Sequence, residues 1–162
     1  MTWLAFHQRA DVLRAVTDEA DRRRDGVLPT HVTGVSAAFR DDSDLLGALQ
    51  MRWYTRLSGA LERSLASHPT DRDTAVREAW VRTAEELPGI RAVLDAHAAN
   101  PTTTQMAHTL ERAKATEQAL LAHAAAAPPA ASTEASEPDR SHRARPRGSA
   151  AFVERLKAAL AA

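Results

Sequence analysis

The fold is decided by residues 41–69, which read DDSDLLGALQMRWYTRLSGALERSLASHP. Within this stretch, a leucine or tryptophan recurs at every fourth position: Leu45, Leu49, Trp53, Leu57, Leu61 and Leu65. Such spacing places the large apolar side chains on one face of an α-helix. The aspartates at the start can cap the first turn, and Pro69 cannot continue the helix. The stretch therefore predicts a long amphipathic helix at the centre of a helical core.

The composition of the chain favours an all-α fold. The 162 residues are 44% hydrophobic, with 35 alanines, 16 leucines and a single isoleucine. Alanine and leucine are strong helix formers, whereas strands prefer β-branched and aromatic residues. The length suits one domain with an appendage. We therefore expect a compact bundle of five or six helices over residues 1–127.

Periodic apolar positions and helix-stop residues predict the other helices of this bundle. We expect them near residues 2–24, 32–39, 70–86, 88–100 and 102–127. In the first helix the expected apolar stripe includes Ala10, and at the start of the fourth Thr70 is the expected cap, within a T-x-x-D variant of the capping box. The expected core consists of Trp3, Phe6, Leu13, Leu45, Leu49, Trp53, Leu57, Leu61, Val76, Trp80, Leu94, Met106, Leu110 and Leu120.

The chain changes character after residue 127. Residues 128–149 are first rich in Pro, Ala and Ser and then in Arg, and they hold no apolar side chain large enough to order a core. We expect them to form a disordered linker. Residues 150–162 have an apolar face at helical spacing, which predicts a short amphipathic tail helix. The equal numbers of basic and acidic residues hide this division, because residues 140–162 carry six basic side chains and one acidic side chain.

Motifs that carry chemistry are missing from the sequence. The absence of cysteine excludes disulfides, thiolate catalysis, iron–sulfur clusters and cysteine zinc sites. No glycine-rich phosphate loop, G-x-S-x-G elbow or Glu-x-x-His metal motif occurs. We therefore predict no catalytic residue, no cofactor and no metal, and a protein that is not an enzyme. His7 and Asp11 are read as an exposed pair, while His97 is read as a core histidine, with a proton-transfer or ligand role left open.

Basic and aromatic residues alternate over Arg52-Trp53-Tyr54-Thr55-Arg56, as they do in proteins that bind single-stranded nucleic acid. Helical phase argues against base stacking here, because Trp53 continues the buried leucine row. Arg52 and Arg56 share a different row, which we interpret as a solvated or ion-paired face.

The C-terminal segment carries the predicted site. The partner-binding candidates are Arg143, Arg145, Arg147, Phe152, Val153, Leu156 and Leu160. Three roles stay open for this segment: docking on its own bundle, recognition by a groove of another protein, or attraction to nucleic acid or an anionic membrane surface. The leading hypothesis is a non-catalytic interaction or adaptor protein with a protein partner. The alternatives are a nucleic-acid-associated regulator that uses the arginines, and a small-molecule binder or enzyme with a pocket between helices.

The sequence also bears on location and assembly. It has no apolar run long enough to span a membrane, and residues 1–9 do not resemble a signal peptide. We therefore expect a cytoplasmic protein that touches membranes at most peripherally. An exposed apolar stripe would support a homo-oligomer as readily as a complex with another protein.

Overall fold

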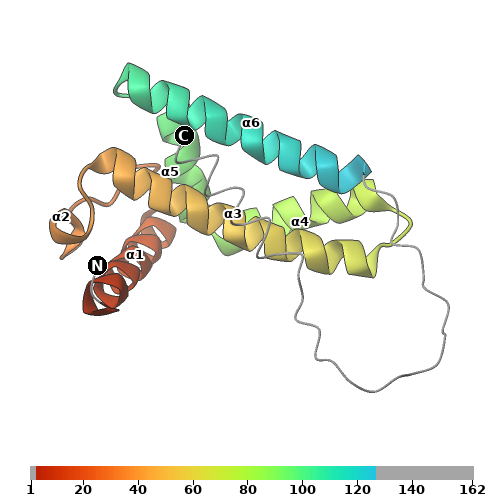
Figure 1. The fold of residues 1–162 in the computed structure, drawn as a ribbon, viewed down its shortest axis with the longest axis horizontal. Coiled ribbons are helices and arrows are strands. Elements are labelled where there is room, and N and C mark those ends of the chain that lie inside the picture. The colour runs from red at the N-terminus through yellow and green to blue at the C-terminus, as the bar shows by residue number, and fades with distance from the viewer. Residues whose placement is uncertain (1–2, 127–162) are drawn as a thin grey trace.

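The computed structural model describes residues 3–126, with side chains described from His7 onward. These residues form six helices and no strand, so the all-α prediction is confirmed for this part of the chain (Figure 1). The helices are α1 (Trp3–Arg23), α2 (Val35–Ala38), α3 (Asp42–Ser67), α4 (Arg72–Glu86), α5 (Pro88–Ala99) and α6 (Thr104–Ala126). The predicted linker over residues 128–149 and the predicted tail helix over residues 150–162 lie outside the described residues.

Helix α3 is the axis of the fold. It runs along the long dimension of the molecule, and α6 lies beside it over much of its length (Figure 1). A short connection after Ser67 returns the chain, and α4 packs against the C-terminal half of α3. Near the other end, α1 packs mainly on α5. Every other long helix therefore contacts α3.

The core has two parts, both built on the predicted leucine row. Leu45, Leu49 and Trp53 are fully buried against residues of α1, α2, α5 and α6. Leu57 and Leu61 are buried against α4 and the C-terminal half of α6. The partly buried Trp80 side chain packs against both parts. The tryptophan of α4 thus joins the two ends of the core.

The start of α3 is fastened to α1 by charged groups. Asp41 Oδ1 accepts a hydrogen bond of 2.8 Å from the Asp44 backbone amide, which confirms that the predicted aspartate cluster caps the helix. The Asp44 carboxylate accepts instead from the Arg9 guanidinium, at 2.9 Å. This hydrogen bond lowers the pKa of Asp44. Arg9 also lies over the Phe39 ring, 4.1 Å from its centroid, so one side chain of α1 holds both the α2 end and the α3 start.

The α1–α5 contact depends on a glycine. A Cβ atom added to Gly89 would lie 2.1 Å from the Ala20 carbonyl carbon, so the two backbones approach more closely than any side chain allows. The Gly89 amide, in the first turn of α5, donates to Asp21 Oδ1 at 2.7 Å. A carboxylate of α1 therefore satisfies one of the free amides at the α5 N-terminus. Pro88 occupies the first helical position, as expected from its missing amide hydrogen.

Two local expectations are wrong. Ala10 is exposed, and Val12 is buried in its place beside Val16 and Ala20. The buried positions of α1 still recur at every fourth residue, but the contacts with α2 and α5 turn this face away from Ala10. The cap of α4 is Asp71, whose side chain accepts from the Thr74 amide, and Thr70 lies one residue too early.

The expected core is largely confirmed. Its members on α3, α5 and α6 are buried, whereas Leu13, Val76 and Trp80 are partly buried. The side chains of Trp3 and Phe6 lie outside the described part. None of the described helices is both long enough and apolar enough to cross a bilayer.

Candidate functional site

The seven partner-binding residues predicted in the C-terminal segment, from Arg143 to Leu160, lie outside the described residues. Residues 3–126 contain two other candidate sites. One is a surface groove along α3, and the other is a partly buried carboxylate held between helices. Their hydrogen bonds and ion pairs indicate which of the two can bind a ligand and which is structural.

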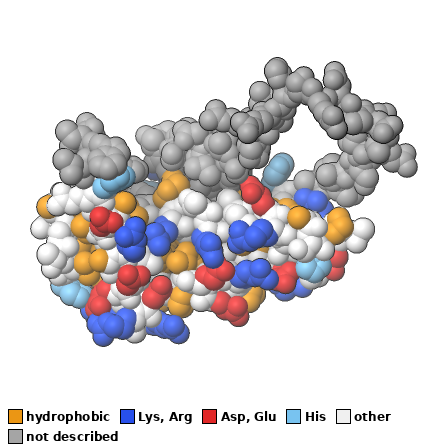
Figure 2. Space-filling view, turned by 90° about the horizontal axis from the view of Figure 1, so that it is seen from below, with side chains coloured by type: hydrophobic (Ala, Val, Ile, Leu, Met, Phe, Trp, Pro, Cys, Tyr) orange, Lys and Arg blue, Asp and Glu red, His pale blue; other side chains and the backbone are white. Residues whose placement is uncertain are grey.

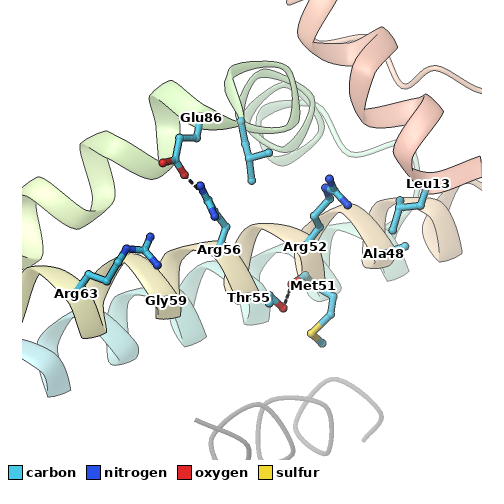
Figure 3. Close-up of a pocket in the computed structure, with 10 residues that line it drawn as sticks. Leu13, Ala48, Met51, Arg52, Thr55, Arg56, Gly59, Arg63 and Glu86 are labelled. Atoms are coloured by element: carbon cyan, nitrogen blue, oxygen red, sulfur yellow. Dashed lines mark hydrogen bonds and ion pairs between the residues drawn. The ribbon is translucent and has the colours of Figure 1, made fainter. Parts of the chain in front are cut away.

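The groove has a volume of about 780 Å³ and is built mainly on α3, with contributions from α1 and from the α4–α5 junction. We call it the arginine groove; it is lined by Leu13, Ala48, Met51, Arg52, Thr55, Arg56, Gly59, Arg63, Glu86 and Leu87. Residues four and seven apart return to the same helix face, so Arg52, Arg56 and Arg63 form a row. Figure 3 shows these arginines rising from the same side of α3, with Glu86 facing Arg56 from the end of α4.

Glu86 is the single carboxylate in the lining of this groove. Arg56 Nε donates a hydrogen bond to Glu86 Oε2. This hydrogen bond lowers the pKa of Glu86, and the positive charges of Arg56, Arg63 and Arg82 lower it further. The carboxyl group is therefore ionised at neutral pH, and one negative charge faces a surplus of guanidinium groups. A site of this kind attracts anions.

Arg52 differs from its two neighbours in the row. Its Nε is buried and has no hydrogen-bond partner, the one side-chain atom in that condition within residues 7–126. Leaving a buried donor unpaired costs free energy. The arginine row therefore contains a buried Nε donor that no acceptor within residues 7–126 satisfies.

The second feature is the Glu117 cluster, made of Glu117, Trp53, Trp80 and Arg91. The Glu117 carboxylate accepts from both indole Nε1 atoms, each at 3.0 Å, and lies 3.4 Å from Arg91 Nη1. The indole rings meet edge to face with centroids 6.2 Å apart, and the Arg91 guanidinium lies 4.8 Å from the centroid of Trp53. Side chains of four helices converge on one carboxylate. Trp80, Arg91 and Glu117 also line a hollow of about 520 Å³, whose other walls come from α3, α5 and α6.

Helix α6 is held by further polar contacts of the same kind. The buried Tyr54 hydroxyl donates to the Ala113 carbonyl, and Arg72 Nε donates to the Ala124 carbonyl at 2.9 Å. Burial, together with the nearby Glu117 charge, raises the pKa of the Tyr54 phenol above its usual range. Both oxygens of the Glu117 carboxylate accept from protein donors, Oε1 from Trp80 and Oε2 from Trp53 and Arg91. These contacts are those of a structural joint between α6 and the rest of the bundle.

The histidine and aspartate considered in the sequence analysis have ordinary structural surroundings. His97 is partly buried, and its Nδ1 lies 2.8 Å from the Val93 carbonyl oxygen of its own helix, as a core histidine would. It lines neither of the two hollows described above. Asp11 pairs with Arg14 at 3.0 Å, on the exposed side of α1. Within the described ranges, no three His, Asp or Glu side chains gather as a metal site would require.

The interpretation of Arg52 and Arg56 as a solvated or ion-paired face is confirmed for Arg56, which is exposed and ion-paired, whereas Arg52 is half-buried. Glu86 comes from another helix, and the sequence pattern does not indicate it. Glu117 shares the helical spacing of Leu110, Ala113 and Leu120, and a carboxylate in such an apolar row indicates a polar partner in the core.

No family model, curated protein or solved structure matches the chain.

Proposed function

We propose that this protein is a non-catalytic helical interaction protein. In this proposal the arginine groove holds a segment of a protein partner, and the basic C-terminal segment, with Arg143, Arg145 and Arg147, adds a second contact. The observation that carries it is the groove itself, where three arginines face one carboxylate on an exposed helix face. The remaining lining residues are apolar or small, which is typical of helix-in-groove recognition.

The titratable groups of the groove support binding more than catalysis. Arginine stays protonated at all physiological pH values, so it orients and stabilises anions without exchanging protons. The pKa of Glu86 is lowered, which moves that carboxyl away from the neutral range in which a general acid or base works best. The groove is therefore equipped to hold a charged ligand.

Affinity purification from the native cell tests this proposal. The full chain is compared with an Arg52→Glu/Arg56→Glu variant, with a chain lacking residues 140–162, and with Arg112→Glu. Arg112 is exposed on α6 and lies outside the groove, so its variant changes the net charge in the same direction without touching the site. Circular dichroism confirms that each variant is folded.

We expect at least one protein to co-purify with the full chain and with Arg112→Glu, and to be lost from the groove variant. Loss from the chain without residues 140–162 would support the second contact. Identical sets of proteins from all four forms would contradict the proposal. Light scattering on the same samples shows whether the partner is a second copy of this chain.

A further inference from the structure

We infer that the occupant of the arginine groove is an acidic amphipathic helix from the partner protein. This inference rests on the proposed function and specifies the chemistry of the partner at the same site. Four features of the groove carry it: its charge, its spacing, its apolar end and its lack of aromatic side chains.

The charge of the groove selects a carboxylate-bearing partner. Arg52, Arg56 and Arg63 lie in one row, and Glu86 occupies only part of this donor capacity. The Arg56 and Glu86 side chains are 48% and 32% exposed, so solvent and ligands reach both. Guanidinium groups bind carboxylates through paired, charge-assisted hydrogen bonds. Two or three carboxylates on the partner would pair with the guanidinium groups that Glu86 leaves available.

The spacing of the row matches another helix. Arg52 and Arg56 are separated by about 6 Å along α3, and Arg56 and Arg63 by about 10 Å, at 1.5 Å per residue. Carboxylates at positions i, i+4 and i+11 of a second helix have the same separations and lie along one face. From Ala48 to Arg63 the groove is about 22 Å long. It therefore accommodates about four turns of helix.

The uncharged lining requires an apolar face beside the acidic one. Leu13, Ala48 and Leu87 lie toward one end, and Met51 adds a flexible apolar side chain. Gly59 has no side chain, and an added Cβ would lie 3.4 Å from Arg63 Nη1. The small residues at positions 48 and 59 let a partner approach the backbone of α3. Leucine or phenylalanine next to the acidic row of the partner would bury this surface.

Two other occupants fit the groove less well. None of its ten lining residues is aromatic, and Trp53 and Tyr54 of the same helix are buried, so the groove offers nucleic-acid bases no stacking surface. Residues 150–162 of this chain have an apolar face but also carry Arg155 and Lys157 and follow a run of arginines. Like charges disfavour that segment in an arginine-rich groove. Figure 2 shows several basic side chains grouped across the middle of the face that it presents, with acidic side chains around them.

Fluorescence anisotropy with the full chain tests the inference. The probe is a labelled helical peptide of about 16 residues, with glutamates at i, i+4 and i+11 and leucines on the adjoining face. Controls are the same peptide with glutamine for glutamate, a labelled single-stranded DNA of similar length, and a peptide with the sequence of residues 150–162. The protein variants are Arg52→Ala, Arg56→Ala and the matched Arg112→Ala.

We expect the glutamate peptide to bind more tightly than every control probe, with an affinity that falls as salt rises. Arg52→Ala and Arg56→Ala should each weaken it about tenfold, since each removes one charge-assisted contact, while Arg112→Ala should not change it. Amide chemical shifts should change at Thr55 and Gly59 when the peptide binds. Equal binding of the glutamine peptide, or tighter binding of DNA or of the 150–162 peptide, would overturn the inference.

The two proposals fail in different ways. If a native partner is lost from the groove variant but the glutamate peptide does not bind, the groove binds a partner of different chemistry and only the further inference is wrong. If no partner depends on the groove, the proposed function is wrong as well. A partner that depends on the groove and competes with the glutamate peptide supports both.

Discussion

Two arginine–glutamate pairs in this molecule have the same chemistry and different surroundings. Arg91 and Glu117 are 20% and 14% exposed, and the carboxylate also accepts from two indoles. Arg56 and Glu86 are 48% and 32% exposed and lie in a groove that also holds Arg52 and Arg63. The first pair is saturated by partners from its own chain. The second retains capacity for an outside ligand, and this difference separates a structural joint from a binding surface.

The two pairs should respond very differently to loss of the carboxylate. Glu117→Ala leaves two indole N–H groups without their acceptor, while the Arg91 guanidinium keeps its pair with Asp95, and this loss should lower the free energy of unfolding by about 2–4 kcal/mol. Glu86→Ala should change it by less than about 0.5 kcal/mol, because solvent replaces the lost partner. Urea denaturation of both variants measures the contrast. Similar values for the two would show that the Glu117 cluster is not a structural joint.

Alkaline pH tests the same joint through Tyr54, the only tyrosine in the chain. The folded protein keeps this phenol neutral, whereas the unfolded phenol ionises near pH 10. Above about pH 10 the unfolded state therefore binds fewer protons, and stability should fall by up to about 1.4 kcal/mol per pH unit. Below that pH the group contributes no pH dependence.

Near-ultraviolet absorbance of the phenolate, recorded together with circular dichroism, checks this expectation. The phenolate band should appear only as the helices unfold. Tyr54→Phe should weaken the protein at neutral pH by about 1 kcal/mol, through loss of the hydrogen bond to the Ala113 carbonyl, and remove this pH dependence. A phenolate band that appears near pH 10 in a fully helical protein would contradict the burial of this side chain.

The two arginines should also differ when each is replaced by alanine. Arg91→Ala removes the guanidinium over Trp53 and its packing against the ring, with an expected loss of about 1–2 kcal/mol. Arg56→Ala should stay within about 0.5 kcal/mol of the parent chain, as exposed substitutions generally do. Thermal or urea unfolding provides the comparison. A larger loss at Arg56 than at Arg91 would reverse the assignment of the two pairs.

The smallest expected effect is the coupling between Arg56 and Glu86. A double-mutant cycle with Arg56→Ala and Glu86→Gln should give about 0.2–1 kcal/mol, decreasing as salt is added, because solvent screens the pair. Removing the Glu86 charge should at the same time tighten binding of an acidic peptide. If Glu86→Gln weakened that binding, Glu86 would be part of the ligand contact and not a competitor for the arginines.

Much of the helical framework could be predicted from the sequence because its causes are local. The leucine row of α3, its aspartate cap and its end before Pro69 depend on residues near one another in the chain. The local predictions were wrong where packing against another helix, or the exact start of a helix, decided the outcome. Ala10 proved exposed because two helices set the buried face of α1, and Asp71 replaced Thr70 as the cap because the first turn of α4 begins one residue later.

The candidate site was less predictable because its partners are distant in sequence. Arg56 and Glu86 are separated by 30 residues, and Trp53 and Glu117 by 64. Periodicity indicates that an arginine is exposed or that a glutamate falls in an apolar row, but it does not indicate which side chain of another helix will meet it. Identifying such partners requires the way the helices pack together, which follows from the whole core at once.

The hydrogen bond between Asp21 and the Gly89 amide has a consequence for the order in which the protein is made. The two residues are 68 positions apart, so at about 5–20 residues per second the ribosome needs roughly 3–14 s to synthesise the second after the first. Throughout that interval α1 exists without the helix that covers it. The α1 side chains that pack on α5 are therefore synthesised before their partner helix, and during this interval they are accessible to solvent and to other proteins.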